Sequence, residues 1–230
     1  MKHGNVTRRI CGMVFYMLFM VSCSAQGKQE QMKNEIIAAV EKGDLPFIQA
    51  HVDGKNVNLR NSKDQTLLMM ATYKNNTEMA TFLIQAGADP NLQDDIQNSP
   101  FLYAAASGYL ELVQLFLNHG ARFDVFNRYG GTGLIPAAEK GHIDVVRLLC
   151  TIKGFPINHV NRLGWTALME AVVLGTGGEI HTEIVNTLLQ AGADPNIPDA
   201  QHITALQHAQ QRGFTSLVKL LQQADKKDRQ

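Results

Sequence analysis

One segment of about 33 residues recurs along the chain, and this recurrence constrains the fold more than any other feature. Its first marker is a Thr or Ser followed by small and apolar residues, at steps of 33, 33, 34 and 38 residues: Thr66, Ser99, Thr132, Thr166 and Thr204. A second marker, an Asn or Asp, stands eight residues before each of them: Asn58, Asn91, Asp124, Asn158 and Asn196. Two markers that keep the same phase predict one structural unit repeated along the chain.

Each copy contains two short apolar stretches with the spacing of an amphipathic helix. Small residues in the first stretches predict close approach between neighbouring copies: Ala105, Ala138 and Ala171. Gly residues follow three of the second stretches, where a left-handed backbone favours Gly: Gly87, Gly120 and Gly192. A pair of short helices cannot bury its own apolar face, so successive pairs must stack into one continuous core.

Longer motifs recur in the same order within the copies. One copy contains Ser99-Pro-Phe-Leu-Tyr-Ala-Ala, another has Gly141-His142 between its helices, and two end in Ala-Gly-Ala-Asp-Pro-Asn, at residues 86–91 and 191–196. On these motifs the chain resembles the ankyrin repeat over about residues 30–225. The resemblance implies an all-α ankyrin-repeat solenoid of about six stacked helix-turn-helix repeats with loop or β-hairpin tips.

One position departs from the ankyrin pattern in every copy. Where the family has a His in the first helix, this chain has other residues: Met69, Leu102, Ile135, Met169 and Gln207. The hydrogen bonds between loops that this His makes in the family are therefore not expected. We expect an array that is less stable than a consensus array of the same length.

The markers divide the predicted ankyrin-repeat domain, residues 32–225, into six copies followed by a polar tail over residues 226–230. The predicted bounds are residues 32–60, 61–93, 94–126, 127–160, 161–198 and 199–225. In the first copy, Gly43 and Asp44 predict the end of one helix and the cap of the next. Two copies are longer, by one residue within 151–156 and by about five around 175–181. We expect tolerated surface loops there, with a partner-specific contact as the alternative.

Residues 1–22 have the pattern of a signal peptide rather than of a folded element. Three positive residues open it: Lys2, Arg8 and Arg9. An apolar run over residues 10–21 follows, and it is short for a membrane-spanning helix. The run ends at Met20-Val-Ser-Cys23, which resembles the lipid-attachment motif of bacterial lipoproteins. This resemblance implies lipidation of Cys23 and, with Ser at position 24, an outer-membrane lipoprotein that faces the periplasm. The alternative is an ordinary signal peptide cut after Ala25, which would leave a soluble periplasmic or secreted protein.

Residues 23–31 are polar and predict a flexible, lipid-anchored tether. The whole chain has 21 Lys and Arg against 21 Asp and Glu, and removal of residues 1–22 leaves 18 against 21. This mildly acidic balance argues against the basic surface that a nucleic-acid partner needs, so no such partner is expected. Cys11 would leave with the signal peptide and Cys23 would carry lipid. Cys150 would then be alone, and no disulfide framework is expected.

The sequence contains none of the short motifs that carry common enzymatic chemistry. It has no His-Glu-x-x-His, no phosphate-binding Gly loop and no Gly-x-Ser-x-Gly, and its eight His residues are not spaced as metal ligands. We expect no catalytic residue, metal, cofactor or small-molecule substrate. Two alternatives stay open: an enzyme that uses His181 and Glu179 of the longest insertion, and a purely structural spacer in the envelope.

In ankyrin-like proteins the loop tips and the exposed side of each first helix form a concave binding face, so the resemblance implies a protein partner. Aromatic, apolar and Arg residues, which dominate interface energetics, gather at those positions in the middle copies. The predicted partner-binding residues are Tyr73, Lys74, Ile96, Phe126, Arg128, Tyr129, Arg162, Leu163, Trp165 and Leu174. The alternative is that Phe126 and Trp165 only pack loop against loop.

These features predict an exported ankyrin-repeat protein that binds a protein partner and is tethered to the cell envelope by lipid at Cys23. A sharper alternative is a periplasmic inhibitor or immunity protein for a toxic enzyme. An anchored, disulfide-free and mildly acidic scaffold suits that role.

Overall fold

The computed structural model describes residues 26–228, and the chain divides into two compact units with a boundary between Val52 and Asp53. The predicted signal peptide, the predicted lipidation site Cys23 and the first residues of the predicted tether lie outside the described residues.

The first unit consists, in its described part, of a helix over residues 26–42 and of α2 (Leu45–His51). Gly43 separates the two helices with a φ of 76°, in the left-handed region that favours Gly. Asp44 caps α2, because its carboxylate accepts a hydrogen bond from the amide of Phe47 at 3.1 Å. The predicted roles of Gly43 and Asp44 are confirmed.

Residues 26–31, which the sequence predicts as part of a flexible tether, are instead helical and continuous with the helix expected from Met32. The residues of this stretch include Gln, Lys and Glu, which all have high helix propensity. Side-chain pairs within the helix support it as well. Gln31 donates a hydrogen bond to Glu35 at 2.8 Å, and Lys33 lies 3.8 Å from Glu30.

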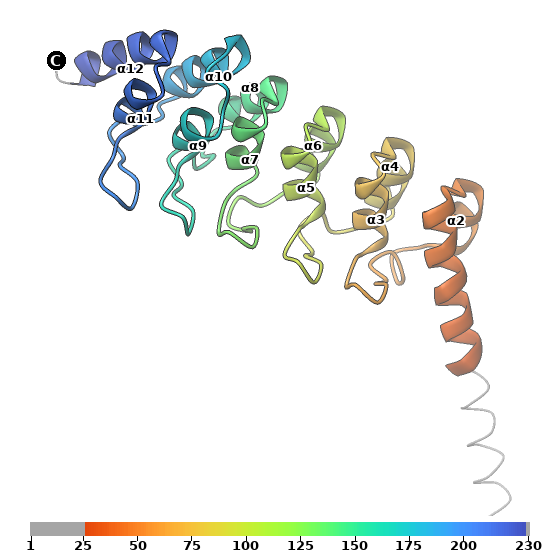
Figure 1. Cartoon of the computed structure of the whole chain (residues 1–230). Coiled ribbons are helices and arrows are strands. Elements are labelled where there is room, and N and C mark those ends of the chain that lie inside the picture. Colours follow the sequence, from red (N-terminus) through yellow and green to blue (C-terminus); the bar gives the residue numbers. More distant parts are fainter. Residues whose placement is uncertain (1–25, 229–230) are drawn as a thin grey trace, which may run out of the picture. The chain divides into compact units, whose positions relative to one another are not determined.

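The described part of the second unit contains five helix pairs, one for each of the other copies of the sequence repeat. The first helices are α3 (Leu67–Tyr73), α5 (Pro100–Ala106), α7 (Leu134–Glu139), α9 (Ala167–Val173) and α11 (Ala205–Gln211). The second helices are α4 (Thr77–Gln85), α6 (Leu110–Leu117), α8 (Ile143–Thr151), α10 (Glu179–Gln190) and α12 (Thr215–Asp228). The pairs stack in chain order, and the loops between them project to one side (Figure 1). The predicted all-α solenoid is confirmed. Strand-like pairing in its described tips is limited to one isolated bridge, between Arg60 and Thr66.

The recurring Thr or Ser is the N-cap of the first helix. The hydroxyl oxygens of Thr66, Ser99 and Thr166 accept hydrogen bonds from the amide three residues later at 3.1 to 3.2 Å. Thr204 forms a capping box with Gln207. Thr132 is the exception, because α7 begins one residue later than the repeat predicts, after Gly133, and the buried hydroxyl of Thr132 has no hydrogen-bond partner.

The core runs between the two layers of helices and continues from pair to pair. Its largest fully buried side chains in the second unit are Phe101, Phe116, Leu67, Leu68, Met69, Met79, Leu83, Leu112, Leu134 and Leu149. The predicted small residues are fully buried: Ala105, Ala138 and Ala171. A Cβ added at Gly133 would lie 2.7 Å from the Cβ of Ala105, so α5 and α7 approach as closely as the small residues predict.

The position at which the ankyrin pattern has a His belongs to this core. At most 3 % of the side chain is exposed at four of its five copies: Met69, Leu102, Ile135 and Met169. Burying an apolar side chain of this size contributes roughly 1.5–3 kcal/mol relative to leaving it exposed. The chain therefore replaces a hydrogen-bonding side chain with apolar packing, which offsets part of the predicted loss of stability.

The second sequence marker connects the loops of neighbouring repeats. The side-chain oxygens of Asn58, Asn91 and Asn158 accept hydrogen bonds from amides 31 to 36 residues later, at 2.8 to 3.1 Å. The side-chain amides of Asn91 and Asn158 also donate to carbonyls in the next repeat at 3.0 Å. Asp124 has no amide group to donate and instead pairs with Arg122 at 2.7 Å. Asn58, Asn91 and Asn158 therefore connect their loops to the loop of the next repeat.

The two insertions differ from simple surface loops. In the first, Phe155 is buried and its ring centroid lies 4.9 Å from that of Phe123. In the second, Gly175 is buried, and a Cβ there would lie 2.3 Å from the ring of His181. A Cβ at Gly177 would lie 2.4 Å from the ring of Phe214. Each insertion therefore places residues against the repeats beside it, although Thr176 and Gly178 are exposed.

Candidate protein-binding groove

An Asn or Asp organises the tip of every loop in the second unit. It stands five residues before the marker Thr or Ser: Asn61, Asp94, Asn127, Asn161 and Asp199. In each tip one side-chain oxygen accepts hydrogen bonds from the amides two and four residues later, at 2.9 to 3.2 Å. These paired bonds fix the backbone of the tip, so the side chains that it carries are held in one arrangement.

A depression of about 610 Å³ lies between these tips and the first helices of the middle repeats, and we call it the central groove. It contains six of the ten predicted partner-binding residues: Tyr73, Ile96, Arg128, Tyr129, Leu163 and Leu174. Four of these are large apolar or aromatic side chains with 47 to 49 % of their surface exposed: Ile96, Tyr129, Leu163 and Leu174. Ile96, Tyr129 and Leu163 lie on the ordered tips and Leu174 caps the end of α9, so the groove presents apolar surface at fixed positions.

Tyr73 lines the groove and is held by hydrogen bonds. Its hydroxyl donates to the buried carboxylate of Asp94 at 2.6 Å and accepts from the side-chain amide of Asn98 at 3.1 Å. Its ring lies 4.4 Å from that of Tyr103 in an edge-on arrangement. Burial and the hydrogen bond to Asp94 raise the pKa of Tyr73 above its usual range. The side chain therefore stays neutral and rigid.

Glu170 is the most unusual group in the groove. It projects from α9, only 5 % of its surface is exposed, and its carboxylate accepts a hydrogen bond from the side-chain amide of Asn161 at 2.9 Å. Burial and the negative charge of Glu139, on the neighbouring helix α7, raise the pKa of Glu170 to about 7. The groove therefore holds two carboxyl groups that repel each other when both are ionised.

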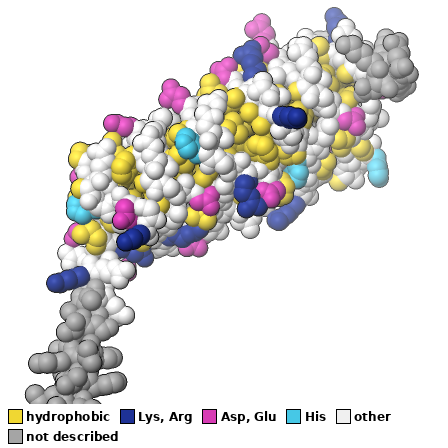
Figure 2. Space-filling view, turned by 180° about the vertical axis from the view of Figure 1, so that it is seen from behind, with side chains coloured by type: hydrophobic (Ala, Val, Ile, Leu, Met, Phe, Trp, Pro, Cys, Tyr) yellow, Lys and Arg dark blue, Asp and Glu magenta, His cyan; other side chains and the backbone are white. Residues whose placement is uncertain are grey.

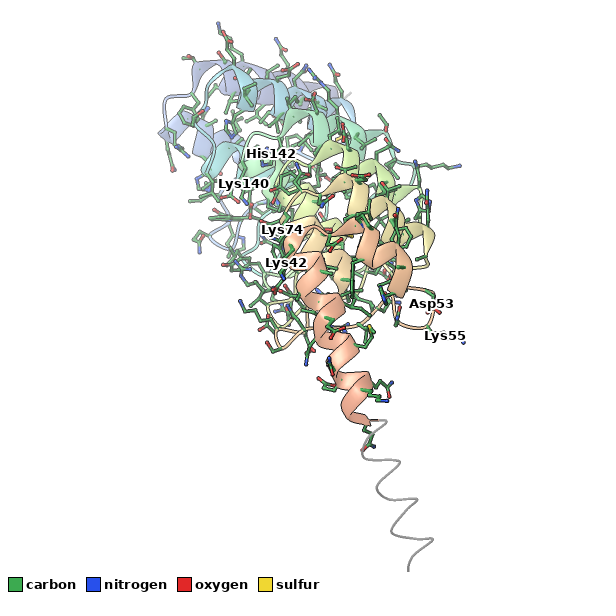
Figure 3. The ribbon with its side chains drawn as sticks, turned by 90° about the vertical axis from the view of Figure 1, so that its right-hand side faces the viewer. Lys42, Asp53, Lys55, Lys74, Lys140 and His142 are labelled. Atoms are coloured by element: carbon green, nitrogen blue, oxygen red, sulfur yellow. The ribbon has the colours of Figure 1, made fainter. Side chains whose placement is uncertain are left out.

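Cationic and polar side chains meet the carbonyl ends of the first helices. Lys140 donates a hydrogen bond to the carbonyl of Ala106 at 3.1 Å. The side chain of His142 also forms a hydrogen bond with the backbone of Ala106. Arg212 donates in the same way to the carbonyls of Val172 and Val173. Positive groups there are favoured by the helix dipole. Lys74, Lys140 and His142 lie on the same side of the second unit, away from Asp53 and Lys55 (Figure 3).

His181 also forms a hydrogen bond at the carbonyl end of a first helix, α7. One ring nitrogen lies 2.8 Å from the carbonyl oxygen of Glu139, and the other is within 3.4 Å of the amide and hydroxyl of Thr176. The side chain is 8 % exposed. Both nitrogens are thus engaged within the fold, and this geometry does not favour the alternative of an enzyme built on His181 and Glu179.

Phe126 and Arg162 line a second depression of about 560 Å³, not the central groove. The ring of Phe126 stacks on that of His159, with centroids 4.5 Å apart. Arg162 donates through its backbone to Tyr129 at 2.8 Å and through its guanidinium to the carbonyl of Arg128 at 3.2 Å. These contacts brace one tip against the next.

Lys74 and Trp165 line neither depression. Lys74 is exposed at the C-terminal end of α3. Trp165 is half-buried, and its backbone amide bonds the side chain of Asn161 at 3.0 Å. The only Trp of the chain is therefore a weaker candidate for a partner contact than Tyr129 or Leu163.

The sequence prediction missed Glu170, Asn161 and Tyr103. The five-residue offset of Asn161 from Thr166 recurs in every loop of the second unit, so the phase of the repeat could have identified it. Glu170 and Tyr103 occupy the variable fifth position of the first-helix motif, four residues after the Thr or Ser. One sequence gives no sign of which of these positions faces a groove.

The part of the chain that the structure describes contains no group of three or more His, Cys, Asp or Glu side chains that could hold a metal ion. Within residues 26–228 no helix has the length and apolar character needed to cross a membrane. Positive and negative side chains intermingle on the face seen from behind (Figure 2).

Comparison with known proteins agrees with the architecture. The family model for three copies of the ankyrin repeat matches residues 36–127 and 101–199, and a model for many copies matches residues 181–222. The ankyrin repeat protein YahD of Escherichia coli (strain K12) is 34% identical over 188 residues, which cover 81% of this chain and 94% of that protein.

Two solved structures are similar over most of their length. The crystal structure of an ankyrin repeat domain from Acinetobacter baumannii AYE has a TM-score of 0.79 and 46% identity, and the match covers 83% of this chain and 97% of that one. The crystal structure of the ankyrin repeat protein EF0377 has a TM-score of 0.78 and 38% identity, over 82% and 96% of the two chains. None of the three names carries an enzymatic activity. The chain belongs to the ankyrin-repeat family.

Proposed function

We propose that the chain binds a protein partner through the central groove. The observation that carries this proposal is that six of the ten residues predicted from the sequence line one depression of about 610 Å³. A binding module is favoured over an enzyme because the groove offers apolar surface on a fixed scaffold, without an assembled nucleophile and base.

The energetics of the groove suit recognition. Ile96, Tyr129, Leu163 and Leu174 are each about half exposed, and covering apolar surface stabilises a complex by roughly 25 cal/mol per Å². Binding also costs the ordering of mobile loops. The hydrogen bonds of Asn127 and Asn161 already order the tips that carry Tyr129 and Leu163, so this cost is small.

Capture of partners from an envelope extract tests the proposal. The bait is the chain without the predicted signal peptide, compared with a Tyr129→Ala, Leu163→Ala double variant. Ile180→Ala is the matched control, because Ile180 is 46 % exposed on α10 and does not line the groove. A partner retained by the native chain and the control, and lost by the double variant, would support the proposal. Equal retention by all three would move the site away from the groove.

Export and tethering are a separate proposal, which rests on the sequence of residues 1–31. The charged start, the short apolar run and the motif that ends at Cys23 support a lipoprotein signal. A lipid at Cys23 would place the groove at the surface of an envelope membrane, facing the periplasm.

Metabolic labelling with radioactive palmitate tests the lipid anchor in a bacterium that expresses the whole chain. The native chain should take up label and sediment with membranes, while Cys23→Ala should take up none. An unlabelled native chain that begins after Ala25 would support the ordinary signal peptide instead. Labelling that persists in Cys23→Ala would place the lipid elsewhere.

A further inference from the structure

We propose that the central groove receives a lysine or arginine side chain of the partner, with its charged end between Glu139 and Glu170. This inference rests on the proposed protein-binding function and adds the chemistry of the segment that binds.

Four charged side chains line the groove, and none of them has an ion-pair partner among the described residues: Arg128, Lys140, Glu139 and Glu170. The guanidinium of Arg128 lies over the ring of Tyr129, 4.8 Å from its centroid, and the ammonium of Lys140 donates to the carbonyl of Ala106. Neither Glu139 nor Glu170 has an ion-pair partner in the described part of the chain. The two cations are exposed to water, whereas the carboxyl group of Glu170 is buried without an opposite charge.

The burial of Glu170 makes this imbalance costly. A carboxylate removed from water is destabilised unless hydrogen bonds and an opposite charge replace its hydration. Asn161 supplies one neutral hydrogen bond, and Glu139 adds repulsion. A cation that enters beside Glu170 would supply the opposite charge that the fold does not.

The walls of the groove suit the aliphatic part of such a side chain. Tyr129, Leu163 and Leu174 line the groove together with the buried Glu170. The three apolar or aromatic side chains are each about half exposed. The methylene groups of Lys or Arg pack along apolar surface while the charged end reaches a polar group. An acidic side chain placed beside Glu170 would add a further negative charge next to Glu139 and Glu170. A purely apolar segment would cover the two carboxyl groups without pairing them.

Selection from a phage-displayed library of random dodecapeptides tests the inference. The target is the protein purified through a C-terminal tag after expression of the whole chain. The peptides selected at pH 7.5 should carry a Lys or Arg flanked by apolar residues. Binding of one synthetic selected peptide should weaken at least tenfold with Glu170→Gln, and by a similar factor when its basic residue is replaced by norleucine. The two changes made together should cost little more than either one, because they remove the same contact.

Glu179→Gln is the matched control, since Glu179 is exposed on α10 outside the groove, and it should leave the affinity unchanged. Selected peptides that require Tyr129 and Leu163 but lack a basic residue, or that ignore Glu170→Gln, would overturn this inference and leave the proposed function standing. Peptides that bind independently of Tyr129 and Leu163, or no enrichment at all, would contradict both.

Discussion

Glu170→Gln should stabilise the array at pH 8 and leave it nearly unchanged at pH 5. Burial and Glu139 raise the pKa of Glu170 from an ordinary value of 4.5 to about 7 in the folded protein. The stability contributed by the neutral acid is fully present below pH 4.5 and is lost as the pH rises through about 7. A shift of this size corresponds to about 3 kcal/mol at pH 8, at ~1.36 kcal/mol per pH unit, before relaxation around the charge reduces it.

The substitution isolates the charge, because Gln keeps the shape and the oxygen that accepts from Asn161. Urea denaturation, followed by circular dichroism, measures the free energy of unfolding of both proteins at pH 5 and pH 8. The advantage of the variant should grow from below about 1 kcal/mol to about 2–3 kcal/mol. Glu179→Gln, at an exposed carboxylate, should show no such growth. A difference independent of pH, or a variant less stable at pH 8, would refute the account of Glu170 as a buried and uncompensated acid.

Three further predictions concern the scaffold. Thr166→Val should lower the free energy of unfolding by about 1 kcal/mol, because it removes a helix cap, whereas Thr132→Val should be neutral or stabilising, because the buried Thr132 hydroxyl has no partner. Urea denaturation of the pair checks this, and equal losses would contradict it. Gly133→Ala should lower the free energy of unfolding by about 1–3 kcal/mol, because the added methyl group would lie 2.7 Å from the Cβ of Ala105 on α5. Gly178→Ala should lower it far less. A thermal melt in which both variants match the native chain would refute the tight helix contact. Burial raises the pKa of the Cys150 thiol to about 11, so at pH 8 a thiol reagent should label it only after unfolding; rapid labelling of the folded protein would contradict this.

Local and periodic features of the fold could be predicted from the sequence. The recurring Thr or Ser at 66, 99 and 166 caps the helix that begins at the next residue, and this contact lies within one helical turn, so the repeating pattern marks where these helices begin. Gly87 and Gly192 have φ of 96° and 90°, as helix ends followed by Gly predict. Residues 26–31 were misassigned because their polar composition fits both a solvated helix and a tether.

The candidate site was only partly predictable, because its shape depends on which side chains of different repeats share a space. Position in the repeat placed Tyr129 and Leu163 at exposed tips, and both line the central groove. The same reasoning gave Arg162 and Trp165 equal weight. The contacts of Arg162 brace the neighbouring tip, and Trp165 is half-buried outside the groove. Glu139 and Glu170 lie on two different helices, α7 and α9, so no pattern within one copy of the repeat predicts the repulsion between them.

Photo-cross-linking in living cells tests the central claim most directly. A photoreactive phenylalanine analogue replaces Tyr129 in the groove or, as the control, Ile180 on α10. The account predicts a discrete protein adduct at position 129 that is absent at position 180, and its loss in a chain that also carries Leu163→Ala. An adduct only at position 180, or none at position 129 in cells that contain the folded protein, would contradict the assignment of the central groove as the binding site.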